Sequence, residues 1–315
     1  MTEVLALRAL GLGDLLASVP ALRGLRRAWP GAHLVLAAPE AVGGWLVSQG
    51  VVDDVVAVRG LDDGDLLVAR AGTTDVAVNL HGRGPQSLRL LARVSAERLV
   101  AYACPEAGVE DGPTWRPDEH EVDRWVRLSQ WAGGATTPDD LRLPPPGDRS
   151  DHVVLHPGAA AGSRRWPAER WAAVASALAA DGHRVVVTGT AGERALSAAV
   201  TSGAAGTEDA CGRHDLSALA ELVGTAALLL SGDTGVAHLA TAFGTPSVTL
   251  FGPVSPGLWG PRIDGQLHRV LWHGDSGDLV PGDPHADTAD PRLLRLQVPE
   301  VLAAARPLLE RAVSR

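Results

Sequence analysis

The sequence contains no lysine, so all 28 of its basic residues are arginine. Asparagine, isoleucine and tyrosine are nearly absent too, with one residue of each type, Asn79, Ile263 and Tyr102. These residue types share AT-rich codons, and their joint depletion indicates a GC-rich genome rather than a structural requirement. The abundance of arginine therefore carries little functional information, whereas the placement of particular arginines can carry more.

Cysteine is scarce as well, with only Cys104 and Cys211. Two cysteines cannot form a disulfide framework or a zinc knuckle, and no Cys/His spacing typical of a metal site is present. No uninterrupted apolar run reaches the ~20 residues that a bilayer span requires. The first apolar stretch is broken by Glu3 and Arg8, which is not the pattern of a secretory signal. We therefore expect a cytoplasmic protein.

The composition is otherwise that of a globular protein, with 315 residues, 45% of them hydrophobic and 21% charged. At roughly 150 residues per domain, this length predicts about two domains. The net charge of −9 argues against a nucleic-acid partner and a polybasic membrane-surface protein, leaving at most a weak peripheral membrane contact. A local cluster of arginines could still bind an anionic substrate.

Short apolar strands alternate with helical patterns along both halves of the chain, which predicts doubly wound parallel sheets of the α/β class. The expected strands are Val4–Leu7, His33–Ala37, Val55–Val58, Asp75–Val78, Val153–Leu155, Arg184–Thr188, Ala227–Leu230 and Ser247–Leu250. Apolar residues recur at helical spacing from Leu15 to Trp29, with a restart or kink expected at Pro20.

A proline-rich segment, Leu143–Asp148, divides the two halves. We expect a Rossmann-like domain over residues 1–143 and a second over residues 144–297, facing each other across a cleft. A closing helix over residues 298–315 could return to pack on the first domain. In open α/β sheets ligands bind beyond the carboxyl ends of the strands, so chemistry is expected in the turns that follow them.

The first such turn holds Gly11, Gly13 and Asp14 directly before a helix. It lacks the third glycine of a dinucleotide fingerprint, because Leu16 occupies that position. Asp14 either caps the helix or projects a carboxylate that can act as a general base.

The second turn runs from His156 through Gly158 to Arg164, Arg165 and Pro167. Backbone amides, a helix start opened by proline and a guanidinium together suit a diphosphate. The alternative is that both arginines lie on a solvated surface. Trp166 is expected in the core.

Two further turns follow strands in the second half. In Thr188–Glu193, Glu193 could accept hydrogen bonds from ribose hydroxyls or could simply favour a helix start. In Ser231–His238, an acid, a hydroxyl and a glycine precede a helix that presents His238 one turn later, an arrangement that suits phosphate oxygens. The alternative is that Asp233 or Thr234 is a simple N-cap and that His238 is a satisfied core histidine. Phe251–Pro256 could form a wall of the same pocket.

In the first half, His81, Arg83 and Arg89 follow the strand that ends near Asn79. These side chains either contact an acceptor or lie on the surface. No G-x-S-x-G elbow and no P-loop is present in the sequence.

Taken in order, these motifs resemble glycosyltransferase family 9, the heptosyltransferases. The matching elements are Gly13-Asp14, Pro20-Ala21-Leu22, Arg164-Arg165-Trp166-Pro167 after a Pro-Gly turn, Asp233-Thr234-Gly235 with His238, and Phe251-Gly252-Pro253. The resemblance implies a GT-B fold and inverting, metal-independent sugar transfer without a cofactor. It further implies a nucleotide-sugar donor, typically ADP-heptose, and a saccharide or glycolipid acceptor.

The resemblance also assigns roles by position. Asp14 corresponds to the base, Arg8 to a basic residue near the acceptor, Arg164 to a catalytic or phosphate-binding lysine, and Glu193 to a ribose-binding residue. Together with the turn analysis, the expected donor-binding residues are Gly158, Arg165, Glu193, Asp233, Thr234, Gly235, His238, Gly252 and Pro253. The expected acceptor-binding residues are Arg8, Gly13, His81 and Arg83.

One departure from the family pattern is that a chain without lysine must use Arg164 in place of the family lysine. Arginine can neutralise a diphosphate, because it is always charged and binds in a bidentate manner. Two alternatives stay open: transfer of another sugar from UDP, GDP or dTDP to a natural product or cell-wall glycan, and a catalytically silent nucleotide-sugar-binding protein. A nicotinamide-dependent oxidoreductase would need a fuller glycine fingerprint.

Overall fold

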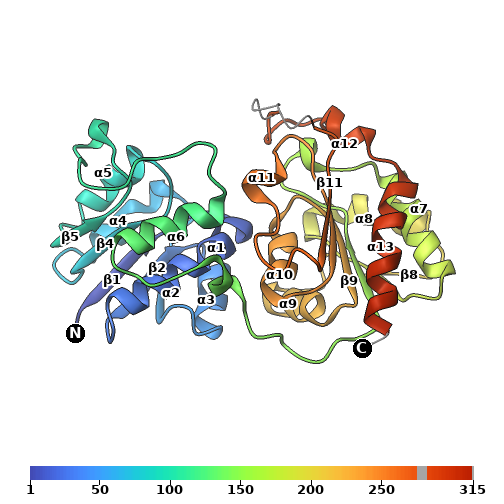
Figure 1. Cartoon of the computed structure of the whole chain (residues 1–315), viewed down its shortest axis with the longest axis horizontal. Helices are drawn as coiled ribbons and strands as arrows, with labels where there is room; N and C mark the ends of the chain where they lie inside the picture. The colour runs from blue at the N-terminus through green and yellow to red at the C-terminus, as the bar shows by residue number, and fades with distance from the viewer. Residues whose placement is uncertain (275–281, 314–315) are drawn as a thin grey trace. The chain divides into compact units, whose positions relative to one another are not determined.

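The computed structural model describes residues 1–274 and 282–313 and divides into two compact units (Figure 1). Unit 1 is Met1–Leu141 and unit 2 is Arg142–Arg315. Each unit contains its own parallel sheet with helices connecting the strands. None of the helices in residues 1–274 and 282–313 is long and apolar enough to cross a bilayer.

The sheet of unit 1 is fully parallel, with the strand order β3-β2-β1-β4-β5. Its strands are β1 (Glu3–Leu7), β2 (His33–Ala38), β3 (Asp54–Ala57), β4 (Val76–Asn79) and β5 (Arg98–Val100). Its helices are α1 (Leu12–Ala17), α2 (Val19–Ala28), α3 (Glu40–Ser48), α4 (Gly64–Val68), α5 (Gln86–Ala92) and α6 (Glu121–Trp131), with 3₁₀ turns η1 (Leu61–Asp63), η2 (Pro105–Ala107) and η3 (Pro138–Leu141).

The break expected at Pro20 is confirmed. Helix α1 ends at Ala17 and α2 begins at Val19, with Pro20 in its first turn. Proline fits there because the first amides of a helix have no partner within it. On one face of the sheet, Leu5, Leu7 and Val35 form a core with residues of the helices that cover it.

The sheet of unit 2 is also parallel, with the order β11-β10-β9-β6-β7-β8. Its strands are β6 (Val153–His156), β7 (Val185–Val187), β8 (Thr207–Asp209), β9 (Leu228–Gly232), β10 (Ser247–Leu250) and β11 (His268–Leu271). Its helices are α7 (Ala168–Ala180), α8 (Arg194–Ser202), α9 (Leu216–Thr225), α10 (Gly235–Phe243), α11 (Pro256–Trp259), α12 (Pro291–Arg295) and α13 (Val298–Val313), with 3₁₀ turns η4 (Gly162–Arg164) and η5 (Ala191–Glu193).

The two units share one topology. Counted from the first strand of each unit, unit 1 has the order 3-2-1-4-5 and unit 2 the order 3-2-1-4-5-6, which is the doubly wound Rossmann order. This confirms the expected α/β class of two Rossmann-like sheets. Strands β5, β8 and β11 were not predicted; β5 and β8 are three-residue edge strands, and β8 contains no apolar residue.

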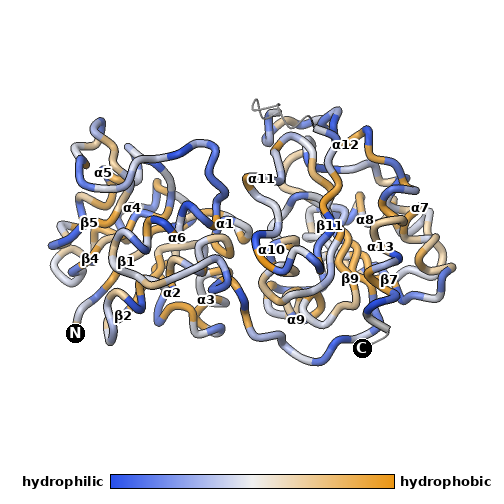
Figure 2. Tube along the Cα trace, in the orientation of Figure 1, coloured by the Kyte–Doolittle hydropathy of each residue, from blue (hydrophilic) through white to orange (hydrophobic). Residues whose placement is uncertain are grey.

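The core cluster of unit 2 lies on one face of its sheet, where alternate residues of β6, β7, β9 and β10 meet α7 and α13, and Figure 2 shows β9 as a hydrophobic stretch. Trp166 is buried, as expected, and meets Trp171 edge to face at 5.0 Å between ring centroids. The closing helix α13 buries Val301, Ala305 and Leu308 in this same core. The expectation that this helix could return to the first domain is therefore wrong: its apolar stripe is used by unit 2.

Two adjacent glycines in α3 test the packing of unit 1. A Cβ at Gly43 would overlap the Val55 side chain of β3, whereas a Cβ at Gly44 would meet nothing within 4 Å. We expect Gly43→Ala to lower the free energy of unfolding by about 1–3 kcal/mol through overpacking. Gly44→Ala should raise it by up to about 1 kcal/mol through helix propensity. Urea unfolding of both variants provides the measurement, and equal effects would contradict the close approach at Gly43.

Candidate active site

In unit 1 the strand order reverses between β1 and β4, and the expected acceptor-side residues follow these two strands. Arg8 and Asp14 follow β1, and His81 follows β4. Ligands of open α/β sheets bind at such a reversal, beyond the carboxyl ends of the strands. The topology therefore brings Arg8, Asp14 and His81 to one edge of the sheet.

Arg8 is fully buried, and its guanidinium contacts several elements. Its Nε donates to the Asp14 carbonyl oxygen (2.7 Å), and its Nη1 donates to the Leu80 carbonyl oxygen. Its Nη2 donates to Asp14 Oδ1 (3.2 Å) and to Glu121 Oε1 (2.9 Å). Hydrogen bonds of Arg8 thus link the ends of β1 and β4 to the starts of α1 and α6.

Asp14 lies in the first turn of α1, and 33% of its side chain is exposed. The residue at the N-cap is Gly11, which makes no side-chain cap hydrogen bond, so Asp14 is not the cap of this helix. Gly13 precedes it within α1. The Asp14 carboxylate is therefore oriented by Arg8 and partly accessible to solvent at the sheet edge.

Glu121 is a site residue that sequence reasoning missed. This first residue of α6 also accepts hydrogen bonds from Trp125 Nε1 (2.8 Å) and Arg124 Nε (3.1 Å). Burial by itself would raise the pKa of Glu121, but the charge and hydrogen bond of Arg8, with help from Trp125 and Arg124, hold this pKa below its ordinary value. These contacts thus favour the ionised form of the Glu121 carboxylate.

His81 is partly buried beside Arg8, and its Nδ1 accepts a hydrogen bond from the Ala9 amide (3.2 Å). Burial, followed by the charge of Arg8, lowers the pKa of His81 to about 4. The imidazole is therefore neutral at physiological pH, with Nε2 as its N–H donor. Arg83, two residues further along the same loop, is exposed to solvent.

In unit 2 the order reverses between β6 and β9. All four turns singled out in the second half of the sequence follow β6, β7, β9 and β10. These strands are neighbours in one parallel sheet, so the turns lie along one edge.

Arg164 follows β6 through η4, and its Nη1 donates to the Asp233 carbonyl oxygen after β9 (3.3 Å). Its Nε is buried and has no hydrogen-bond partner in the described part of the chain. Arg165 is exposed and donates to the Ala159 carbonyl oxygen (2.9 Å).

Glu193 lies against the backbone of Gly158. A Cβ at Gly158 would overlap the Glu193 carboxylate, so only glycine permits this close approach of two turns. Glu193 Oε2 accepts hydrogen bonds from the amide and the hydroxyl of Thr190, both at 2.8 Å. Beneath them, His156 Nδ1 is 3.0 Å from Thr188 Oγ1. Burial lowers the pKa of His156 to about 4, although the charge of Glu193 opposes this shift.

The remaining donor-side residues lie around the start of α10. Asp233 is buried, and its amide donates to the Leu250 carbonyl oxygen (3.1 Å). Thr234 is the N-cap of α10 but makes no side-chain cap hydrogen bond, and Gly235 is the first residue of the helix. His238 meets Trp259 edge to face at 6.0 Å. The simple capping alternative therefore does not explain the Thr234 hydroxyl.

The turn after β10 is held by its carbonyl groups. The Gly252 carbonyl oxygen accepts from Trp272 Nε1 (3.1 Å), and that of Pro253 accepts from the Gly282 amide (2.8 Å). These bonds fix the segment beside Asp233 and Arg164 on the same sheet edge.

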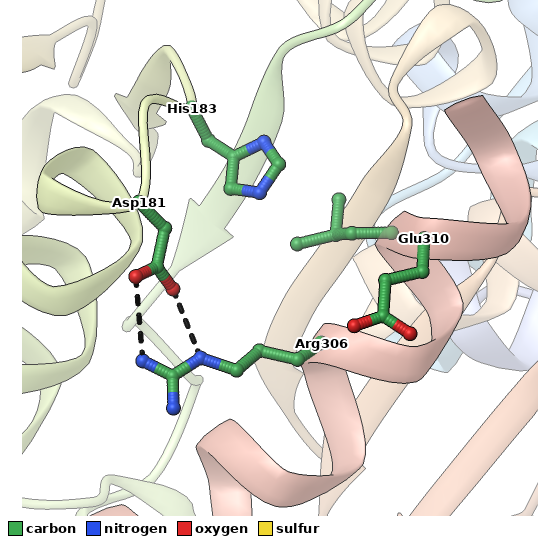
Figure 3. Close-up of a pocket in the computed structure, with 5 residues that line it drawn as sticks. Asp181, His183, Arg306 and Glu310 are labelled. Carbon is green, nitrogen blue, oxygen red and sulfur yellow. Dashed lines mark hydrogen bonds and ion pairs between the residues drawn. The ribbon is translucent and has the colours of Figure 1, made fainter.

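A shallow cavity of about 500 Å³ lies elsewhere in unit 2 and is lined by Asp181, His183, Arg306, Leu309 and Glu310 (Figure 3). Asp181 and His183 precede β7, so the cavity lies at the amino ends of the strands. The Arg306 side chain reaches across it to Asp181, with an Nε–Oδ2 distance of 2.9 Å. It is separate from the edge that carries the candidate site.

Each unit is of the Rossmann type, and in each the chemically distinctive residues follow the strands on both sides of the reversal. Two such units define the GT-B class of fold. Residues 125–274 match the family model described as "Glycosyltransferase family 9 (heptosyltransferase)". This match covers slightly less than half of the chain, and over that segment the chain is similar to the family that the motifs resemble.

Curated proteins are similar to parts of this chain, and solved structures share its fold. A segment of 119 residues, 37% of this chain, is 34% identical to lipopolysaccharide heptosyltransferase 1 of Pseudomonas aeruginosa. The match spans 32% of that relative's length. Among solved structures, the family 9 glycosyltransferase of Veillonella parvula (TM-score 0.81, 21% identity, 98% of each chain covered) shares the fold. The E. coli ADP-heptose lps heptosyltransferase II shares it too (TM-score 0.80, 20% identity, 98% of this chain and 99% of that one covered).

The two neutral histidines provide a test of the site geometry. Because the folded-state pKa values of His81 and His156 lie near 4, both imidazoles should stay neutral as the pH falls from 8 to 5. The unfolded chain takes up these protons near pH 6.5, so the stability they contribute is present above that pH and is lost as the pH falls toward 4. Histidine side-chain NMR, assigned with His81→Gln and His156→Gln, measures both midpoints. A midpoint above pH 6 for His81 would contradict its burial beside Arg8.

Proposed function

We propose that this protein is an inverting, metal-independent glycosyltransferase. In this proposal it moves a heptose from a nucleotide-sugar donor, ADP-heptose, to a hydroxyl of a saccharide or glycolipid acceptor in lipopolysaccharide-type biosynthesis. The observation that carries the proposal is the division of chemistry between the two sheet edges. An accessible carboxylate, Asp14, lies on one edge, and the start of α10 with Arg164 lies on the other. The relatives whose names specify heptose transfer support the choice of sugar.

The proposed reaction is a single displacement. Asp14 removes the proton of the acceptor hydroxyl while its oxygen attacks the anomeric carbon of the donor sugar. The bond from that carbon to the diphosphate breaks, and the nucleoside diphosphate leaves with the bonding electrons. Attack from the opposite face inverts the anomeric centre.

Unit 2 supplies the donor side in this proposal. The free amides at the start of α10 and the guanidinium of Arg164 stabilise the negative charge that develops on the leaving diphosphate. Glu193 binds ribose hydroxyls, and Gly158 leaves room for the nucleotide because it has no side chain. Asp233, Thr234, His238 and the Gly252-Pro253 turn complete the donor pocket.

Unit 1 supplies the acceptor side. His81 is a neutral hydrogen-bond donor, and Arg83 is an exposed cation in the same loop. Both suit a polar acceptor. The buried Arg8 orients Asp14, and we propose that it acts on the acceptor through this carboxylate.

The choice of nucleotide can be measured directly. We expect calorimetric titration to show binding of ADP in preference to UDP, GDP and NAD. Arg164→Ala should weaken ADP binding by about 10-fold or more, because a charge-assisted hydrogen bond is lost. Arg170→Ala is the control, since the Arg170 guanidinium bonds the Leu294 and Leu296 carbonyl oxygens and not the Asp233 turn. Preference for UDP or GDP would replace heptose by another sugar, and binding of NAD alone would overturn the proposal.

Removing the base should separate catalysis from binding. We expect Asp14→Asn to lower kcat by about 10²–10⁴-fold, because the amide cannot accept the hydroxyl proton. The Kd for ADP should stay within about 2-fold, since unit 2 carries the donor residues. ADP release from ADP-heptose, with a lipopolysaccharide inner-core saccharide as acceptor, measures the rate.

The matched control for this variant is Asp53→Asn. Asp53 is equally exposed (34%) and is also paired with an arginine, Arg26 (3.0 Å), but it lies away from the β1–β4 reversal. Full transfer by Asp14→Asn would remove Asp14 from the mechanism. ADP binding without turnover by the unmodified protein would indicate a silent nucleotide-sugar-binding protein.

A further inference from the structure

We propose that Glu121 is a positioning residue that acts on Asp14 through Arg8. This inference rests on the proposed role of Asp14 as the base. It adds a residue that the family motifs in this sequence do not contain.

Arg8 links the two carboxylates through one nitrogen. Its Nη2 is 3.2 Å from Asp14 Oδ1 and 2.9 Å from Glu121 Oε1. Its Nε and Nη1 are directed at carbonyl oxygens of Asp14 and Leu80, so the plane of the guanidinium is fixed. Because the Asp14 and Glu121 carboxylates share Nη2, the charge and position of Glu121 bear directly on the bond that orients the Asp14 carboxylate.

Glu121 is itself held in place. Trp125 Nε1 donates to Oε1 (2.8 Å) and Arg124 Nε donates to Oε2 (3.1 Å). The Trp125 ring also lies against the Arg8 guanidinium, 4.7 Å from ring centroid to Cζ. Helix α6 thus contacts Arg8 through an ion pair and through an aromatic ring beside the guanidinium. Glu121 lies 113 residues after Arg8 in the sequence.

The charge balance explains why a second carboxylate is needed. A buried guanidinium without a counter-charge is costly, and Arg8 is fully buried. When Asp14 takes up the acceptor proton it becomes neutral, and Arg8 would lose its partner at that moment. Glu121, with only 13% of its side chain exposed, keeps Arg8 paired throughout the reaction. Asp14 is then able to accept the proton without leaving a buried charge unpaired.

Glu121→Gln tests this role, because it keeps the shape and removes the charge. We expect kcat to fall about 10–100-fold, while KM for ADP-heptose and the Kd for ADP stay within about 2-fold. The matched control is Glu119→Gln. Glu119 is similarly buried (11% exposed) and pairs with Arg127 (2.6 Å), but it has no contact with Arg8. Both variants lose a partly buried ion pair, and only Glu121→Gln should lose turnover.

A second variant keeps the test valid if Glu121→Gln does not fold. Trp125→Phe retains an aromatic ring beside Arg8 and removes the N–H donor to Glu121. It should lower kcat by about 2–10-fold with KM unchanged. Circular dichroism and thermal unfolding establish that each variant is folded.

The outcomes separate this inference from the proposed function. A folded Glu121→Gln variant with normal kcat, alongside an inactive Asp14→Asn variant, would overturn the role of Glu121 alone. Equal losses in Glu119→Gln and Glu121→Gln would assign both residues to general stability and overturn it as well. Full activity of Asp14→Asn, or no transfer by the unmodified protein, would overturn the proposed function and this inference with it.

Discussion

The parallel alignment of the strands is the constraint on which both candidate sites depend. Because neighbouring strands run in the same direction, every strand of a unit ends at the same edge. In each unit the order reverses beside the first strand, and the connections diverge there. Short turns that are widely separated in sequence are thereby brought to one edge without a dedicated binding domain. Examples are the turns with Asp14 and His81 in unit 1, and those with Arg164 and Asp233 in unit 2.

The key arginines at the two sheet edges differ in how completely they are paired. In unit 1 the buried Arg8 is matched by Asp14 and Glu121, and Glu121 is matched in turn by Arg124. In unit 2 Arg164 contacts a carbonyl oxygen, and its Nε has no partner in residues 1–274 and 282–313. A compensated network suits the orientation of a base. An incompletely bonded guanidinium beside a helix start suits the binding of an anion.

Local patterns predicted much of this architecture. The strands of both cores, the helix break at Pro20, the buried Trp166 and the functional turns all follow from apolar runs and turn residues within a few positions. The three-residue strand β8, Thr207–Asp209, lacks such a run. Glu121 could not be predicted, because its contact with Arg8 depends on how α6 packs in unit 1 and its local sequence shows only an ordinary helix start. The same reasoning explains Arg8: the sequence shows a basic residue near the site, but only the packing shows that it is fully buried.

The absence of lysine has different consequences at the two key arginines. At residue 8 the structure uses properties that lysine lacks: a planar fork directed at several acceptors, and a flat face against Trp125. At residue 164 the guanidinium can bind a diphosphate but stays charged at any physiological pH, so it cannot carry a proton during the reaction. His81 uses its Nδ1 lone pair in the hydrogen bond from the Ala9 amide, and Glu121 on the same unit 1 edge is committed to Arg8, Trp125 and Arg124. In the proposed reaction, Asp14 is then the partly exposed group on this edge that can receive the proton of an acceptor hydroxyl.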